Sequence, residues 1–152
     1  MADLHLLDFY KDTAQALVRL HNSFPRKIEL YVEDLIGPDH VDEFGLHSKR
    51  HEACLGAFLW LADENYIRFQ STIRQEAIDQ AILTSKAVVL LGTITTALYS
   101  ESAEDNRHQE LPSFESQERL TLVEHIRRAL KSESSVELTQ VMKAFFERGH
   151  SR

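Results

Sequence analysis

The first part of the chain carries apolar residues at helical spacing. Between Asp3 and His21 these residues recur at steps of three and four, which places them on one face of an α-helix. Pro25 ends the pattern, because proline interrupts the hydrogen bonding of a helix. We therefore predict an amphipathic first helix, whose apolar face is formed by Leu4, Leu7, Ala14, Leu17 and Leu20.

The next segment alternates between apolar and more polar residues. Ile28, Leu30 and Val32 are each followed by a polar or aromatic residue, which is the period-two pattern of a half-buried strand. A single helical turn is the alternative interpretation of so short a run. After the Gly-Pro turn that follows, residues 39–46 have room for a short helix of about two turns.

A longer, more apolar helix is predicted from Ser48 to Asn65. The Ser48 hydroxyl is suited to accept a hydrogen bond from an otherwise unpaired amide at the helix start. Apolar residues occupy one face and widen around the axis until little polar surface remains, so most sides of the helix should be buried. The first turn stays polar, with Lys49, Arg50, His51 and Glu52.

Residues 66–84 fit two interpretations. As strands, 66–70 and 77–84 form a β-hairpin with its tip near Arg74 and Gln75, although this tip lacks the Gly, Asn or Pro that usually makes a turn. As a helix, the apolar residues of the segment also line one face, and the residue types favour it. We favour the hairpin, because tertiary context often overrides local propensity.

Three further helices and an acidic loop are predicted in the remainder of the chain. The apolar run 84–99 is interpreted as a helix capped by the threonine or serine at its start. Residues 100–114 are polar, acidic and without periodicity, which indicates a loop. Helical spacing returns in 115–131 and 135–148, and the short link between these two helices predicts a helical hairpin.

Length and composition fit one mainly helical domain. A chain of 152 residues with 43% apolar residues can build a single core. We divide the domain 1–152 into an N-terminal helix (1–24), a core (27–99), the acidic loop (100–114) and the C-terminal helical hairpin (115–149). The first residues lack the basic region of a signal peptide, and no apolar run reaches the roughly 20 residues of a membrane helix. We therefore expect a cytoplasmic protein without a membrane segment.

Charge and cysteine content restrict the chemistry further. The net charge is −7, and the stretches 26–48 and 101–116 each contribute −4. Acidity of this kind opposes generic attraction to nucleic acid without excluding a local contact. Cys54 is the only cysteine, which excludes an intrachain disulfide, and its apolar surroundings predict a buried thiol.

The order of predicted elements resembles that of winged helix-turn-helix domains. The stretches HSKRHEA, LADENYIRF and ILTSKAVVLL are similar to three features of that superfamily: the capped basic first turn, the helix end, and the step from the wing strand into the next helix. The resemblance covers roughly residues 27–91. It implies a mainly α fold with a small β-hairpin, in which a winged-helix-like core is joined by the terminal helices.

The resemblance also implies a function and a site. It places residues 48–65 as the recognition helix, whose N-terminal residues contact base edges in DNA-binding members. We expect DNA-linked regulation through double-stranded DNA, with a protein-interaction module or accessory subunit that does not bind DNA as the alternative. Apolar surface on the terminal helices predicts a homodimer. The implied nucleic-acid-binding residues are Ser48, Lys49, Arg50 and His51 on the helix, with Arg68 and Arg74 on the wing.

Metal binding and catalysis receive less support from the sequence. His47, His51 and Cys54 are spaced i, i+4 and i+7, which on a helix would bring three metal-binding groups near one face. Eight histidines in this chain make such spacings common by chance, so we interpret them as surface or capping residues and predict neither metal nor cofactor. No phosphate loop, serine elbow or HExxH motif is present, and we do not predict an enzyme.

Overall fold

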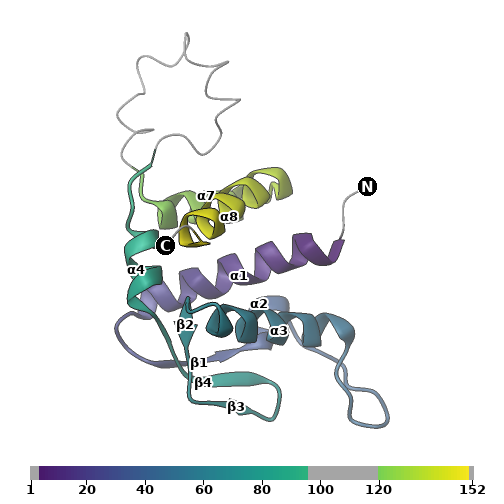
Figure 1. Cartoon of the computed structure of the whole chain (residues 1–152). Coiled ribbons are helices and arrows are strands. Elements are labelled where there is room, and N and C mark those ends of the chain that lie inside the picture. Colours follow the sequence, from purple (N-terminus) through teal and green to yellow (C-terminus); the bar gives the residue numbers. More distant parts are fainter. Residues whose placement is uncertain (1–3, 96–119, 151–152) are drawn as a thin grey trace. The chain divides into compact units, whose positions relative to one another are not determined.

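The computed structural model describes residues 4–95 and 120–150, which belong to two compact units, Met1–Val88 and Val89–Arg152. Both units contain helices, and the first also contains a small antiparallel sheet (Figure 1). The prediction of a mainly helical chain with a β-hairpin is confirmed. Across the described ranges, no helix has the length and apolar character needed to cross a membrane.

Helix α1 (Leu4–Ser23) forms where the apolar spacing predicts it. Its inner face contains Ala14, Leu17 and Leu20, which are fully buried or nearly so. The helix contacts α3 (Lys49–Asp63) and β4 (Ala77–Leu83). The three- and four-residue spacing read from the sequence is thus the face of α1 that joins the core.

Strand β1 (Ile28–Tyr31) runs directly into helix α2 (Val32–Ile36). The strand and the helical turn, which were alternatives for this segment, therefore both occur, one after the other. Leu30 and Val32 point into the core and are 1% and 0% exposed. Gly37 ends α2 with a φ of 92°, a left-handed conformation that glycine adopts at little cost.

The prediction of a short helix in residues 39–46 is wrong. This segment is a loop around Asp42, whose Oδ1 accepts hydrogen bonds from the amides of Phe44 and Leu46, both at 2.9 Å. An aspartate side chain that bonds nearby amides competes with helical hydrogen bonding. The short helix lies one segment earlier, in α2.

Helix α3 begins at the predicted residue. Ser48 is its N-cap, and the Ser48 Oγ accepts a hydrogen bond from the His51 amide at 3.1 Å. The helix contacts α1, α2 and β2 (Ile67–Arg68). Its buried apolar residues are Cys54, Ala57, Phe58 and Leu61. These form one face, while Ala53, Gly56 and Trp60 are exposed, so the prediction that most sides of the helix are buried is wrong.

The β-hairpin is confirmed, and β4 is the central strand of the sheet. Strands β2 and β3 (Ser71–Ile73) pair antiparallel with one edge of β4, and β1 pairs with the other edge. At the tip, Arg74 and Gln75 have φ values of 51° and 61°, and the Glu76 amide donates to the Ile73 oxygen at 2.7 Å. Positive φ at both central residues matches the twist of paired strands, so this turn forms without glycine or asparagine.

Helix α4 (Ser85–Leu91) is shorter than the helix predicted over 84–99. Thr84 caps it, since the Thr84 Oγ1 accepts a hydrogen bond from the Ala87 amide at 3.3 Å. After Gly92 the chain is extended, and Ile94 forms an isolated bridge with Thr121. Residues 96–99 and the acidic loop 100–114 lie outside the described residues.

The two C-terminal helices are confirmed as α7 (Leu122–Ser132) and α8 (Ser135–His150), which pack against each other. Thr121 caps α7 by accepting a hydrogen bond from the Glu124 amide at 3.3 Å. Glu133 takes a left-handed conformation, with φ 60°, at the end of α7. The part predicted at 115–119 lies outside the described residues. The completely buried apolar residues of the pair include Leu122, Ile126, Val141, Met142 and Phe145.

Candidate functional site

The first turn of α3 lies beside the tip of the hairpin. The ring nitrogen Nε2 of His51 is 2.9 Å from the backbone oxygen of Gln75. Because a carbonyl oxygen only accepts, this nitrogen carries the proton and donates it. Two segments 24 residues apart in the sequence, the helix start and the hairpin tip, are therefore held together by one hydrogen bond.

Arg50 does not present a free guanidinium at this site. Its Nη1 and Nη2 donate to the two carboxylate oxygens of Asp12 on α1, both at 2.7 Å, and its Nε is 3.6 Å from Asp8. Asp12 is 1% exposed, and the hydrogen bond to it raises the pKa of Arg50. The pair is a bidentate structural contact, so Arg50 no longer qualifies as a residue that contacts DNA.

His51 is also withdrawn from the surface. It is 1% exposed, and its ring is directed into the protein, where Nε2 meets Gln75. A side chain in this position cannot reach a base edge. Its role in the first turn of α3 is internal, which differs from the role implied by the resemblance.

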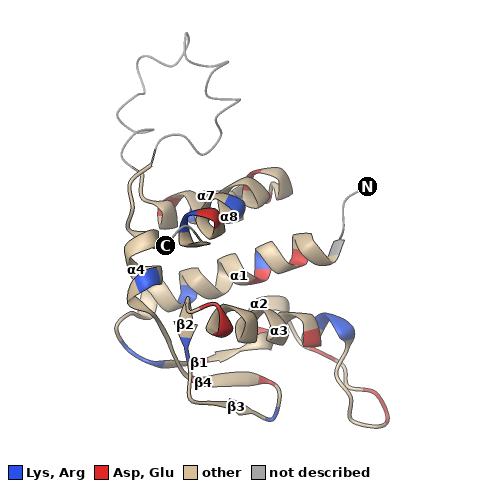
Figure 2. Cartoon of the chain, viewed as in Figure 1, with Lys and Arg blue, Asp and Glu red and all other residues tan. Residues whose placement is uncertain are grey.

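The other predicted nucleic-acid-binding residues remain accessible. Ser48, Lys49, Arg68 and Arg74 are exposed, and Ser48 has the additional role of capping α3. Within residues 4–95 and 120–150, the side chains of Lys49, Arg68 and Arg74 form no ion pair. Figure 2 shows that basic and acidic residues are interspersed along the first unit.

Arg68 belongs to a small hollow beside the sheet. Lys27, which precedes β1, shares this hollow of about 230 Å³. Its remaining lining residues are Phe69, Gln70, Gln80 and Ile82. The hollow therefore combines two cations with amide groups, a combination suited to an anionic group such as a phosphate.

Beyond its first turn, α3 exposes small and aromatic residues. Ala53 and Gly56 are exposed, and a Cβ added at Gly56 would meet no atom within 4 Å. Trp60 is 37% exposed, and its ring packs edge-on against Phe9 of α1 at 5.1 Å between centroids. The only charged residue of α3 beyond its first turn, Asp63, is an acid. This face lacks the Arg, Asn or Gln side chains that read base edges.

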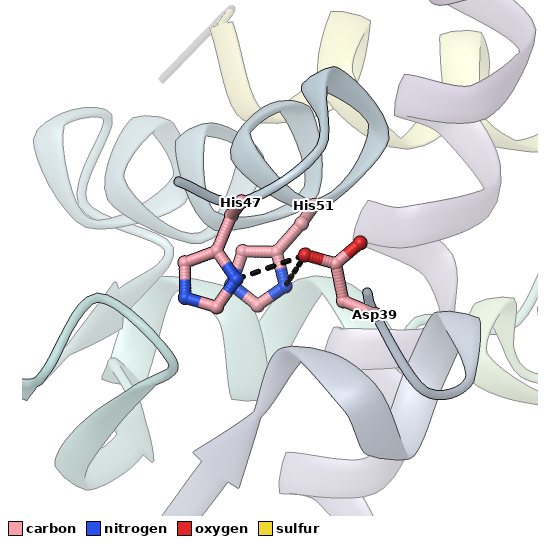
Figure 3. Close-up of side chains that lie close together, drawn as sticks. All are labelled: Asp39, His47 and His51. Carbon is pink, nitrogen blue, oxygen red and sulfur yellow. Dashed lines mark hydrogen bonds and ion pairs between the residues drawn. The ribbon is translucent and has the colours of Figure 1, made fainter. Parts of the chain in front are cut away.

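A cluster of metal-binding side chains lies beneath the first turn of α3. The Nδ1 atoms of His47 and His51 are 2.8 Å and 3.7 Å from Oδ2 of Asp39. The two imidazole rings are stacked, with 3.8 Å between centroids and 5° between planes. Figure 3 shows both rings directed toward the carboxylate. Hydrogen bonding from the Ser48 side chain, with a further contribution from His47, holds the pKa of Asp39 well below its usual range.

His47, His51 and Cys54 stand out in the sequence by their spacing, and the histidines are predicted to be surface or capping residues. In the structure His51 is buried, and His47 and His51 lie beside Asp39. His47 precedes the cap Ser48, so it is not part of the helix, and the i, i+4, i+7 spacing does not bring Cys54 to it. Asp39 takes that place, because the loop 37–48 folds back on the start of α3 and the Ser48 amide donates to Asp39 Oδ2 at 3.1 Å. A carboxylate eight residues before His47 was the available signal.

Cys54 lies in a separate, buried environment. Burial raises the pKa of its thiol to about 12, and the negative charge of Asp12 contributes in the same direction. Since the thiolate is the reactive form, we expect a thiol reagent at neutral pH to label native protein far more slowly than denatured protein. Mass spectrometry of a labelling time course measures this. Equal labelling rates in the two states would contradict the burial of Cys54.

Comparison with known proteins adds no assignment. No family model, curated protein or solved structure matches the chain.

Proposed function

We propose that the first unit is a winged-helix-like module that binds double-stranded DNA in a regulatory role. The observation that carries the proposal is the 2.9 Å contact between His51 Nε2 and the Gln75 oxygen, which holds the start of α3 beside the hairpin tip. Lys49 and Arg74, one on each side of this contact, are exposed. Their charges are therefore available to phosphates from two adjoining elements.

The arrangement of elements supports the same proposal. The sequence order α1, β1, α2, α3, hairpin, α4 is the order on which the resemblance to winged helix-turn-helix domains rests. In that order α3 is the recognition helix, and the β2/β3–β4 hairpin is the wing. The hydrogen bond between α3 and the hairpin tip is consistent with both elements approaching one duplex.

The available side chains favour phosphate contacts over base reading. Lys49, Arg68 and Arg74 are cations, and with Arg50 and His51 engaged internally, α3 retains few groups that distinguish base pairs. We therefore expect binding that depends strongly on salt and weakly on DNA sequence. The chain's net charge of −7 lowers the affinity further.

One observation favours a second function. The exposed residues of α3 after its first turn are Ala53, Gly56 and Trp60 with one acid, Asp63. Small and aromatic residues let another protein approach closely. The second candidate is therefore a protein-interaction module or accessory subunit of the same fold that does not bind DNA.

Fluorescence anisotropy with a labelled random duplex separates the two functions. With about three phosphate contacts, the affinity should fall roughly 40-fold between about 50 and 200 mM salt. Binding with such a salt dependence supports the DNA function. Absence of binding at about 50 mM salt contradicts it and leaves the interaction module.

A further inference from the structure

Three potential metal ligands converge from two parts of the first unit. Asp39 and His47 come from the loop between α2 and α3, and His51 comes from the first turn of α3 (Figure 3). One ligand atom from each residue lies within 4.8 Å of the other two. A metal ion bound to two ligands at about 2.1 Å holds those ligand atoms roughly 3 to 3.5 Å apart, so small side-chain adjustments would close the cluster around an ion.

The Nδ1 atom of His51 is a buried nitrogen without a hydrogen-bond partner among the described residues. The Nε2 atom of the same ring carries the proton that is donated to Gln75, so in the neutral ring Nδ1 holds a lone pair. This Nδ1 faces Asp39 Oδ2 at 3.7 Å, which is also an acceptor. Two acceptors facing each other require something electropositive between them.

The surroundings of His51 match those of a metal-binding histidine. A histidine ligand commonly donates its second ring N–H to a carbonyl or carboxylate, which fixes the tautomer and the ring direction. The hydrogen bond from Nε2 to the Gln75 oxygen does this for His51. The nitrogen directed into the cluster is thereby the one left free to bind a cation.

The donor set selects the class of ion. Two imidazole nitrogens and one carboxylate oxygen suit first-row divalent transition metals, and three protein ligands leave coordination positions open for water. The side chains of Asp39 and His47 are 8% and 12% exposed, so the cluster lies close enough to solvent for exchange. An all-oxygen ion such as Mg²⁺ is disfavoured by the two imidazoles.

We propose that Asp39 Oδ2, His47 Nδ1 and His51 Nδ1 form a binding site for a divalent transition-metal ion of the Zn²⁺ class. On binding, the proton that His47 Nδ1 donates to Asp39 moves by exchange with solvent to Nε2 of the same ring, so that His47 binds as a neutral imidazole, and His51 uses its existing lone pair. The ion links the loop 37–48 to α3 and, through the His51–Gln75 hydrogen bond, to the hairpin tip. This site is independent of DNA binding and stands if the duplex experiment fails.

The experiment is a calorimetric titration of chelator-treated full-length protein with Zn²⁺, and with Mg²⁺ in parallel. We expect a single Zn²⁺ site per chain and no heat from Mg²⁺. His47→Ala and Asp39→Asn should each weaken Zn²⁺ binding by at least the 10- to 100-fold typical of losing an outer partner of a metal site. His40→Ala is the matched control, because His40 is exposed in the same loop; it should bind as the wild type does.

A second measurement identifies the ligand atoms and does not depend on variants that fold poorly. In wild-type protein labelled with ¹⁵N at histidine, Zn²⁺ should shift the Nδ1 resonances of two rings. In the bound state both rings should carry their proton on Nε2, which is new for His47 and unchanged for His51. Zn²⁺ binding that survives in both His47→Ala and Asp39→Asn, or shifts confined to other histidines, would overturn the proposal. Absence of Zn²⁺ binding in the wild type would also overturn it and leave an intramolecular contact between His51 and Asp39.

Discussion

Replacing Arg50 with alanine is expected to lower the free energy of unfolding by about 3 kcal/mol. The guanidinium makes two 2.7 Å hydrogen bonds to Asp12, which is 1% exposed. Its removal leaves a buried carboxylate without a counter-charge, and that penalty exceeds the net value of the pair itself. Chemical denaturation followed by circular dichroism measures the change.

Three comparisons make the Arg50 result specific. Arg50→Lys should fall between wild type and Arg50→Ala, because lysine keeps the charge and loses the bidentate geometry. Lys49→Ala, one residue earlier and exposed, should stay within about 0.5 kcal/mol of wild type. The double variant Asp12→Ala, Arg50→Ala should recover part of the loss. An Arg50→Ala protein as stable as wild type would contradict the structural assignment of this arginine.

Replacing Phe58 with alanine should destabilise the protein by about 3 to 5 kcal/mol. Phe58 is 0% exposed and belongs to the buried face of α3, so its loss removes apolar burial and leaves a cavity. Phe44→Ala is the matched control, since the chemical change is identical and Phe44 is 78% exposed in the loop before α3; it should cost less than about 0.5 kcal/mol. Similar losses from both variants would contradict a core role for α3.

The elements that the sequence predicted well are those with strong local signals. Helix α1 follows from its apolar spacing, and α3 follows from an apolar run behind the capping Ser48. The hairpin has no local turn signal, because Arg74 and Gln75 are unusual turn residues. Both take left-handed conformations. The turn is stabilised by contacts distant in sequence, namely strand pairing on both edges of β4 and the His51–Gln75 hydrogen bond.

The wrong prediction at residues 39–46 has a local cause that the helical pattern does not reveal. The Asp42 carboxylate bonds the amides of Phe44 and Leu46, and Asp39 bonds the Ser48 amide. These side-chain contacts hold a loop in a segment whose length alone suggested a helix. The sequence shows that acidic residues are present in this segment. Only the structure shows which backbone amides their carboxylates accept hydrogen bonds from.

The site predictions depended on contacts that are distant in sequence. Arg50 and His51 have the chemistry of DNA-contacting residues, but their partners Asp12 and Gln75 lie 38 and 24 positions away. No local pattern signals either contact. Ser48, Lys49, Arg68 and Arg74 stay exposed, so four of the six predicted residues remain candidates for DNA contact. Asp39 was missed because a single loop carboxylate has no pattern of its own.

The most direct test of the DNA-binding proposal compares two charge-matched double variants in the duplex assay. Lys49→Ala, Arg74→Ala removes both cations beside the His51–Gln75 contact and leaves the structural Arg50 intact. Lys131→Ala, Lys143→Ala removes the same charge from exposed positions on α7 and α8.

The slope of log affinity against log salt is the quantity to compare. The proposal predicts that the slope becomes shallower by about 1.8 in Lys49→Ala, Arg74→Ala, because two phosphate contacts are lost, and stays at the wild-type value in the control. Equal slopes in the two double variants would contradict a DNA interface at the start of α3 and the hairpin tip.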